Sequence, residues 1–246
     1  MLPAQPLPVH VQLALEEVLL SRLATGEGAP ALRFWEWSEP ALILGSNQVL
    51  ANEVDRQAAE QLGFAIGRRM SGGGTMIVEP ERTITYSLYA PASLVAGLSF
   101  VESFAHLDAW VVDCLRRLGV PAGYRPINDI LSPEGKIGGA AQARRRGCLL
   151  HHTTIAYQME PELVGRLIRI GRERVSSLGV RSAEKQVSPL ARWTDMSRPQ
   201  VVGALSDHFQ THHGGRLRRL SAAELAEARL LAASKYATAG WIDRLR

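Results

Sequence analysis

The sequence has no apolar run long enough to span a bilayer, and residues 1–8 lack the charged and apolar regions of a signal peptide. Cysteine is scarce, since Cys114 and Cys148 are the only two in 246 residues, too few for a disulfide framework or a metal cluster. Internal repeats and low-complexity linkers are also absent. We therefore expect a cytoplasmic, globular protein with no membrane partner.

The composition and the charge of the chain further limit the class of protein and its partners. A hydrophobic fraction of 46% provides for a sizeable core, and we expect residues 1–246 to form one domain. The formal net charge is +4, and basic residues cluster at 144–146, 166–174 and 216–219. No nucleic-acid-binding motif accompanies them, so we expect no nucleic-acid partner. Solvated faces, an anionic cofactor and an acidic protein partner remain as explanations.

Hydrophobic periodicity predicts helices alternating with groups of strands. Helical spacing and capping patterns predict helices over residues 9–24, 52–62, 99–118, 160–176, 199–212 and 221–236. Short apolar or alternating runs predict strands over residues 32–37, 41–44, 63–66, 75–78, 83–89, 128–131, 136–142 and 148–157. We expect Asn52 to cap its helix, residues 121–127 to form a loop, and strand 83–89 to join the sheet of strands 63–66 and 75–78. Hairpins separated by helices favour an α+β fold.

The stretch from Gly67 to Gly74, with the sequence GRRMSGGG, lies between two predicted strands. Consecutive glycines permit positive φ and let backbone N–H groups approach a ligand. Arg68 and Arg69 place two guanidinium groups beside this turn, and a guanidinium matches phosphate or carboxylate because its donors form a planar fork. The pattern indicates an anion-binding turn, and a flexible hairpin with two solvated arginines is the alternative.

A second informative region is the predicted hairpin of Asn128–Leu131 and Lys136–Gln142. Its short turn allows Asp129 and Lys136 to lie near one ligand, where the ammonium group can act as a point charge on a carboxylate or phosphate. Small residues from Gly138 to Ala141 leave room for a ligand against the backbone. A lysine that only protects a strand edge from aggregation is the alternative.

Together these motifs resemble the lipoate–protein ligase A family, which belongs with the biotin and lipoyl ligases. The resemblance is carried by Gly45-x-Asn47-Gln48, Arg68-Arg69-x-Ser71-Gly72-Gly73-Gly74, Asn128-Asp129-Ile130, Gly135-Lys136-Ile137-x-Gly139-x-Ala141-Gln142, His152-x-Thr154 and Lys235-Tyr236-Ala237-Thr238-x-x-Trp241. It covers nearly the whole chain in motif order. It implies the catalytic core shared with biotin ligases and class II tRNA synthetases, a mixed, largely antiparallel sheet with flanking helices.

The resemblance also implies two-step chemistry that uses ATP and Mg²⁺. The carboxylate of lipoate, or of octanoate, attacks the α-phosphate of ATP to give acyl-AMP and pyrophosphate, and a lysine of a lipoyl carrier domain then takes the acyl group. Lys136 is the implied catalytic residue, because it can bridge the carboxylate and the α-phosphate. Asp129 would orient Lys136 or help to position Mg²⁺. The remaining implied substrate and nucleotide contacts are Arg68, Arg69, Ser71, Gly72, Gly73, Gly74, Thr75, Asn128, Asp129, Gly139, Ala141, His152 and Thr154.

The partners that the resemblance implies are lipoyl carrier domains, either the E2 subunits of 2-oxoacid dehydrogenases or the H protein of glycine cleavage. The sequence leaves the carrier, the acyl group and the oligomeric state open. Full-length ligases of this family carry a C-terminal accessory domain, whereas this sequence ends shortly after Trp241. We therefore expect either a separate accessory-domain protein as a partner or a chain that performs only the transfer half-reaction efficiently by itself.

Two alternatives remain open, and two departures from the family pattern bear on the second of them. Val78-Glu79 stands where the family usually has His-Asp, and Thr153 stands where it has Gly. The first alternative is an octanoyl- or lipoyl-transferase that acts without ATP; such enzymes place a catalytic cysteine in the loop before the lysine hairpin, and residues 121–127 contain none. The second alternative, which the departures motivate, is a non-catalytic lipoate or biotin binding module.

The remaining reactive side chains have plainer expected roles. We expect both cysteines to be buried in the core. His151 and His152 are adjacent in a predicted strand and point to opposite faces, so they do not form a two-histidine metal site. His212 and His213 are expected in a solvated turn beside two glycines. Lys185 falls where the family has a nucleotide-covering loop.

Overall fold

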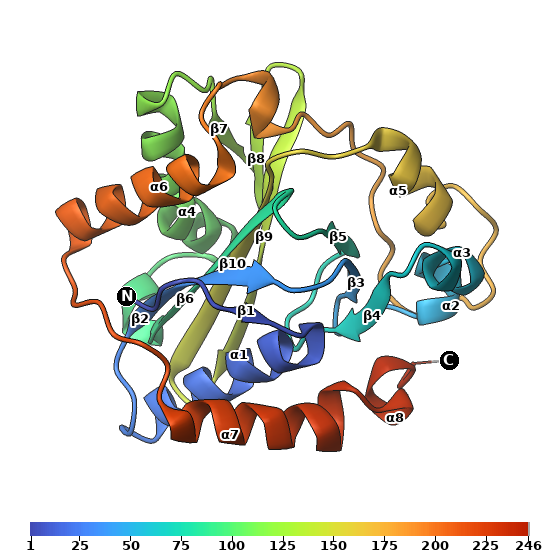
Figure 1. The fold of residues 1–246 in the computed structure, drawn as a ribbon, viewed down its shortest axis with the longest axis horizontal. Helices are drawn as coiled ribbons and strands as arrows, with labels where there is room; N and C mark the ends of the chain where they lie inside the picture. The colour runs from blue at the N-terminus through green and yellow to red at the C-terminus, as the bar shows by residue number, and fades with distance from the viewer. Residues whose placement is uncertain (246) are drawn as a thin grey trace.

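The computed structural model describes residues 1–245 and contains two β-sheets (Figure 1). The larger sheet has seven strands in the order β1-β2-β6-β10-β9-β8-β7, and the smaller has three in the order β4-β3-β5. β1 pairs with β2, and β4 with β3, in parallel, whereas the other neighbouring strands are antiparallel. The expected α+β class with a mixed, largely antiparallel sheet is confirmed.

The elements alternate along the chain as groups of strands and helices. The strands are β1 Pro6–Leu7, β2 Ala31–Trp37, β3 Ala41–Leu44, β4 Ala65–Arg68, β5 Met76–Val78, β6 Thr83–Pro91, β7 Gly123–Arg125, β8 Asp129–Ser132, β9 Gly135–Arg145 and β10 Cys148–Ala156. The helices are α1 Val9–Ala24, α2 Leu50–Glu53, α3 Arg56–Gln61, α4 Phe100–Arg117, α5 Pro161–Leu167, α6 Arg198–His213, α7 Ala222–Leu231 and α8 Ala239–Ile242. None of the helices in residues 1–245 combines the length and apolarity that a membrane span requires.

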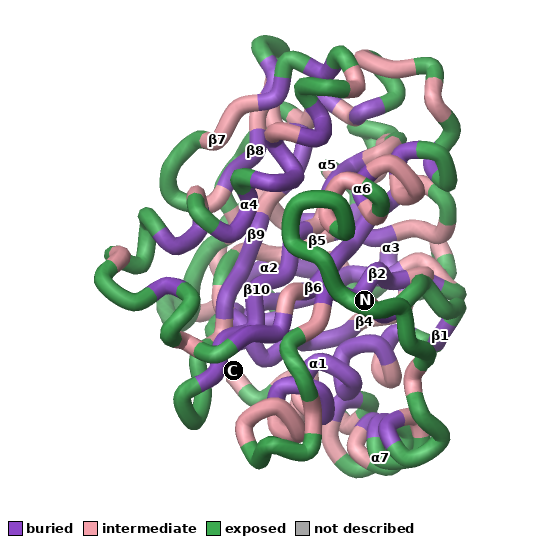
Figure 2. The backbone as a smooth tube through the Cα atoms, turned by 90° about the vertical axis from the view of Figure 1, so that its left-hand side faces the viewer, coloured by how far each residue is buried: buried purple, intermediate pink, exposed green. Residues whose placement is uncertain are grey.

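Alternation along the strands divides the larger sheet into two faces. On one face, Phe34, Tyr86 and Ile155 pack with α4 and α6, which cover that side of the sheet (Figure 1). On the other face, Trp35 and Trp37 pack against α1, α7 and the smaller sheet. Successive side chains of a strand point to opposite faces, so each central strand contributes to both cores. Figure 2 shows the result as a buried centre formed by β6, β9 and β10.

Two predicted helices are shorter in the structure. The helix predicted over residues 52–62 is divided into α2 and α3, because Asp55 caps α3 through a bond from the Ala58 N–H (3.0 Å). Asn52 caps no helix and donates instead to the carbonyl oxygen of Ser176 (2.8 Å). The helix predicted over 160–176 ends at Leu167, since the next residue, Ile168, forms a β-bridge and no longer continues the helix.

Three interpretations of strands and their connections were also wrong. β6 does not join the sheet of β4 and β5 but pairs with β2 and β10 in the larger sheet. β4 and β5 flank β3 on either side, so residues 69–75 cross over the end of β3 and do not form a hairpin turn. Residues 121–127, predicted as a loop, contain the short strand β7, which pairs with β8.

Candidate functional site

One face of the larger sheet carries a row of residues that crosses five strands. Asp129 on β8 is in register with Gly139 on β9, which is in register with Thr154 on β10. Thr154 is in turn opposite Thr85 on β6, and Thr85 is opposite Trp35 on β2. Directly opposed residues share a face of the sheet, so these five residues lie side by side on one face, which is called the floor of the site below. Three of the residues predicted from the motifs, Asp129, Gly139 and Thr154, are therefore neighbours.

Lys136 reaches across this floor to Asp129. Its ammonium nitrogen lies 2.9 Å from Oδ1 of Asp129, and the ammonium group of Lys185 bonds to Oδ2. Burial would raise the pKa of Asp129, but the two ammonium groups outweigh it and hold that pKa below its usual range. Burial lowers the pKa of Lys136, and Asp129 offsets only part of this. Two cations around one carboxylate leave a surplus of positive charge that suits an anionic ligand.

The same arrangement bears on the predicted Mg²⁺ site. Both carboxylate oxygens of Asp129 face an ammonium group, whereas Mg²⁺ needs oxygen ligands in near-octahedral geometry. The residues as placed do not fit a metal ion. Mg²⁺ binding at Asp129 stays a prediction, and it requires Lys185 to move away.

Substitution of Gly139 tests whether the position of the Lys136 ammonium matters. A Cβ added at Gly139 would lie 2.5 Å from Nζ of Lys136. Because Nζ is the end of a flexible side chain, we expect Gly139→Ala to change the free energy of unfolding by less than about 1 kcal/mol and to lower acyl-transfer activity by roughly 100-fold, the effect of displacing a reacting group by about 1 Å. Gly203→Ala on α6, where a Cβ meets open space, is the matched control. Steady-state kinetics and thermal unfolding separate the two effects, and unchanged kinetics in Gly139→Ala would show that the ammonium position is unimportant.

Arg69 stabilises the stretch from Gly67 to Gly74, called the glycine loop below, by hydrogen bonds to the backbone of the loop. Its guanidinium donates to the carbonyl oxygens of Gly72 (2.6 Å), Gly74 (2.8 Å) and Ile43 (3.1 Å), and to the hydroxyl of Ser71 (3.1 Å). Burial lowers the pKa of Arg69 to about 10, so the group stays charged at neutral pH. Sequence analysis had placed this guanidinium on the substrate, but in the structure its donors bind the protein's own backbone. Contact between Arg69 and a substrate stays a prediction.

Arg68, on the other side of the strand, also donates its hydrogen bonds to backbone carbonyl groups. It donates to the carbonyl oxygens of Gln48 (2.7 Å), Gly45 (2.9 Å) and Ile242 (2.6 Å). Burial and the nearby Arg244 lower its pKa to about 10. Gly45 itself is required by close packing, because a Cβ there would lie 2.0 Å from the carbonyl oxygen of Gly73. These contacts attach the base of the loop to residues 45–48 and to Ile242.

Ser71 connects the loop to the floor through a buried chain of hydrogen bonds. Its hydroxyl lies 2.7 Å from Nε2 of His152, whose Nδ1 lies 2.7 Å from Oε2 of Glu16 on α1. The other Glu16 oxygen accepts from Tyr89 (2.5 Å) and lies 3.6 Å from the guanidinium of Arg33. These side chains are all buried. The chain ties α1, the larger sheet and the glycine loop together.

The charge states of this chain follow from burial and partners. Burial would raise the pKa of Glu16, but His152, Arg33 and Tyr89 outweigh it and lower the pKa, so Glu16 is a carboxylate. Burial lowers the pKa of His152, which Glu16 only partly opposes. A neutral His152 donates from Nδ1 to Glu16 and accepts at Nε2 from Ser71, whose oxygen accepts from Arg69. Every group then has a compatible partner.

Sequence analysis found Ser71 and His152 but missed Glu16. The available signal was an acidic residue in the apolar stripe of a helix, since Glu16 follows Leu13 by three residues and precedes Leu20 by four. A carboxylate at such a position is buried only when paired.

The irregular segment after α5 covers the glycine loop. The Ser182 hydroxyl accepts from the Thr75 N–H (2.9 Å), and the Val180 N–H donates to the carbonyl oxygen of Asn47 (2.8 Å). Further along, the Lys136 N–H donates to the carbonyl oxygen of Gln186 (2.8 Å). The segment that carries Lys185 therefore lies beside both the glycine loop and the strand of Lys136.

The other predicted site residues line the same region. Ala141 is in register with His152, and the Thr154 hydroxyl contacts the sulfur of Met76 (3.2 Å). Asn128 is directed to the backbone, where its amide donates to the carbonyl oxygen of Ala140 (2.5 Å). It therefore fixes the start of the β8–β9 hairpin, and its contact with a substrate stays a prediction.

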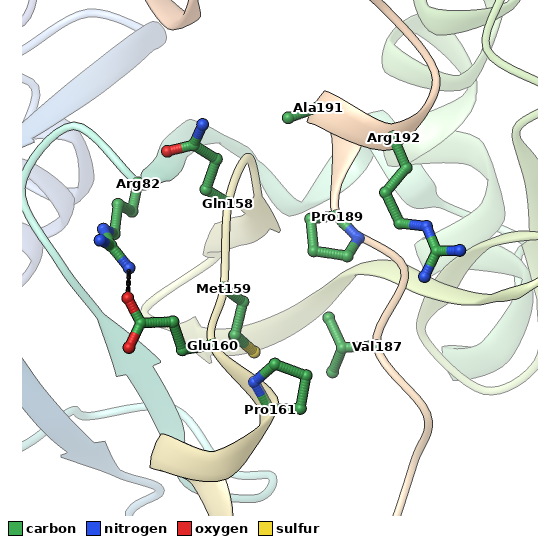
Figure 3. Close-up of a pocket in the computed structure, with 9 residues that line it drawn as sticks. All are labelled: Arg82, Gln158, Met159, Glu160, Pro161, Val187, Pro189, Ala191 and Arg192. Carbon is green, nitrogen blue, oxygen red and sulfur yellow. Dashed lines mark hydrogen bonds and ion pairs between the residues drawn. The ribbon is translucent and has the colours of Figure 1, made fainter.

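A surface cavity of about 480 Å³ adjoins this region (Figure 3). Its apolar wall includes Met159, Val187 and Pro189, and the ion pair of Arg82 with Glu160 (2.6 Å) lies at its side. Val187 is the bridge partner of Lys136, so the cavity lies next to that strand. None of the residues predicted from the motifs lines it.

The fold, with a lysine–aspartate pair on one face of a largely antiparallel sheet, is that of the catalytic core that lipoyl ligases and transferases share. The family model described as "Lipoyl protein ligase A/B catalytic domain" matches residues 8–210. This chain belongs to that family.

The relatives divide between two reactions. The chain is 30% identical to an octanoyltransferase LipM of Kyrpidia tusciae, over 93% of this chain and 92% of the relative. The structure is similar to a chain of the bipartite lipoate protein ligase of Thermoplasma acidophilum, with a TM-score of 0.83, 25% identity and coverage of 100% and 96%. It is also similar to a lipoate-protein ligase A bound with ATP, with a TM-score of 0.82, 25% identity and coverage of 99% and 98%. Family membership thus makes the chain an enzyme of acyl transfer, with ligase and transferase chemistry both represented.

Proposed function

We propose that this chain is the catalytic chain of a lipoate–protein ligase. Lipoate or octanoate attacks the α-phosphate of ATP, pyrophosphate leaves, and the acyl group of the resulting acyl-AMP passes to a lysine amine of a lipoyl carrier domain while AMP leaves. Lys136 bridges the carboxylate and the α-phosphate and offsets the negative charge that develops between them. Lys185 supplies a second cation from the covering segment, and Asp129 positions both ammonium groups.

The positions of the two cysteines favour a ligase over a transferase. The transferases that this family resembles hold the acyl group on a cysteine thiol during transfer. Cys148 pairs in register with Arg145 at the far end of the β9–β10 hairpin, nine residues along β9 from Lys136, which is roughly 30 Å at 3.4 Å per residue. Cys114 lies on α4 on the opposite side of the sheet, where burial raises the pKa of its thiol to about 11. Ligase chemistry requires neither thiol, because both attacking groups come from substrates.

The second candidate is an octanoyltransferase, which the similarity to octanoyltransferase LipM favours. It would transfer the acyl group from a thioester on a carrier protein without ATP. The two candidates differ in their use of ATP. A ligase exchanges pyrophosphate into ATP when lipoate or octanoate is present, whereas a transferase shows no such exchange.

An ATP–pyrophosphate exchange assay on the purified full-length chain separates them. We expect exchange with lipoate and with octanoate and little with biotin. A parallel reaction with synthetic lipoyl-AMP and a lipoyl domain measures the second step alone. Transfer from octanoyl carrier protein in the absence of ATP, together with no exchange for any acid, would overturn the ligase assignment and establish the transferase.

Substitution of Cys148 provides a second test. If the chain is a ligase, Cys148→Ser should retain nearly all ATP-dependent activity and should lose about 1–2 kcal/mol of stability, because a hydroxyl replaces a thiol in a packed site. Intact-mass spectrometry after incubation with octanoyl carrier protein should show no acyl adduct on the wild-type chain. An adduct that Cys148→Ser abolishes would identify Cys148 as the nucleophile of a transferase.

The partners follow from the same proposal. The acyl acceptor is a lipoyl carrier domain, an E2 subunit or the glycine cleavage H protein. The similar ligase of Thermoplasma acidophilum is described as bipartite and with its E2 lipoyl domain. We therefore propose that a separate accessory chain accelerates acyl-AMP formation here without being required for it.

A further inference from the structure

A second cluster of polar side chains lies on the opposite side of the larger sheet from Lys136. Asp113 on α4 and His208 and His212 on α6 each place one potential ligand atom within 4.8 Å of the other two. α4 and α6 pack together over the face that carries Phe34 and Tyr86, whereas Asp129 lies on the other face. The cluster has no part in acyl transfer as described above.

Its geometry joins two helices at one point. His208 and His212 are one helical turn apart on α6 and so lie on the same face, with ring centroids 4.1 Å apart. Nε2 of His208 lies 3.3 Å from Oδ2 of Asp113 across the helix interface. Sequence analysis had placed His212 in a solvated turn, but α6 continues through His213. Because His212 is helical, its imidazole lies one turn after that of His208 and reaches the cluster.

A backbone contact fixes the ring of His212. Nδ1 of His212 lies 2.8 Å from the carbonyl oxygen of His208, and a carbonyl can only accept, so Nδ1 carries the proton. Nε2 is then the nitrogen with a free lone pair. Metal-ligating histidines commonly donate their other ring N–H to a carbonyl or carboxylate in this manner, which sets the tautomer and orients the ring.

We propose that Asp113, His208 and His212 form a binding site for a borderline divalent transition-metal ion, with Zn²⁺ as the reference ion. Two imidazoles and one carboxylate are a donor set for Zn²⁺, and water would complete a tetrahedron. Arg117 competes for the site, because its guanidinium lies 2.9 Å from Oδ2 of Asp113. That side chain is 64% exposed and can turn into solvent when an ion binds. The bound ion would fasten α4 to α6.

The expected consequence is a metal-dependent rise in stability. Binding to the folded state alone stabilises it by mass action, and at a free ion concentration of 100 Kd the melting temperature of a chain of this size should rise by about 5–10 °C. The effect does not depend on activity, so it is measurable whichever acyl-transfer reaction the chain performs.

The test uses the purified, tag-free, full-length chain after removal of metal with EDTA and dialysis. Thermal unfolding is followed during titration with ZnCl₂, and visible absorption is followed during titration with CoCl₂. His212→Ala and Asp113→Asn should each lower Zn²⁺ affinity at least tenfold, and Arg117→Ala should raise it. His213→Ala is the matched control, since this neighbouring histidine packs against Phe209 and is outside the cluster. A wild-type melting temperature that Zn²⁺ leaves unchanged, or a Zn²⁺ effect that His212→Ala and Asp113→Asn both retain, would overturn the proposal.

Discussion

Replacement of Lys136 by alanine is expected to lower kcat/KM for acyl transfer by about 10²–10³-fold, the loss usual when one preorganised charge donor is removed from an active site. The structure supports this expectation because the ammonium group of Lys136 is held over Gly139 by Asp129, with Lys185 on the other carboxylate oxygen. Stability should change by less than about 1 kcal/mol, since Asp129 retains Lys185 as its partner. Kinetics with lipoate and octanoate, together with circular dichroism, measure both quantities.

The control for this variant is Arg229→Ala, which removes an exposed cation from α7. It changes the net charge by the same amount without altering the site, so its kcat/KM should match that of the wild type. A Lys136→Ala variant that works within threefold of the wild-type rate would remove Lys136 from the catalytic machinery and leave it as an ion-pair partner of Asp129.

Replacement of Glu16 by alanine is expected to give the largest loss of stability, about 3–5 kcal/mol, which corresponds to a melting temperature lower by roughly 6–20 °C. Arg33 is 2% exposed and its guanidinium lies 3.6 Å from Glu16, so the variant leaves a buried cation without its carboxylate. Tyr89 and His152 lose their shared acceptor as well. Urea unfolding of the wild type and the variant at pH 7 measures the difference.

The same residue predicts a pH dependence with a definite sign. The pKa of Glu16 in the folded protein lies below its ordinary value of 4.5, so ionised Glu16 stabilises the fold above that pH. This contribution is lost as the pH falls from 4.5 through the folded-state pKa. Glu16→Gln should therefore show a smaller loss of stability between pH 7 and pH 4 than the wild type. Glu27→Gln, at a side chain that is 64% exposed, is the control and should follow the wild-type curve. Parallel curves for the wild type and Glu16→Gln would contradict an ionised, paired Glu16.

Sequence alone placed the lysine–aspartate pair because a hairpin is a local structure. Asp129 and Lys136 are seven residues apart, and once both strands are identified from their alternating residues, the register brings the two side chains together. The long helices α1, α4 and α6 were predicted for the same reason, since their apolar spacing lies within the segment itself and α4 and α6 begin at a local capping box.

The features that sequence did not predict depend on partners far along the chain. Asn52 has the character of a helix cap, yet it bonds to Ser176, 124 residues later, and Asp55 takes the capping position. Arg69 has the character of an anion ligand, yet nearby carbonyl groups satisfy its donors. The type of a side chain limits which hydrogen bonds it can form. Contacts with residues distant in sequence determine which of these bonds forms in the fold.

The bond between Arg68 and Ile242 has a consequence for the order in which the protein becomes active. The guanidinium donates to the Ile242 carbonyl oxygen, 174 positions later, and Trp241 donates back to the carbonyl oxygen of Arg68 (2.8 Å). During translation the glycine loop emerges early and waits for these two residues, which at 5–20 residues per second takes about 9–35 s. Until they arrive, the loop lacks one of the acceptors that fix it over the sheet. The glycine loop thus reaches its full set of hydrogen bonds only after residue 242 has been synthesised.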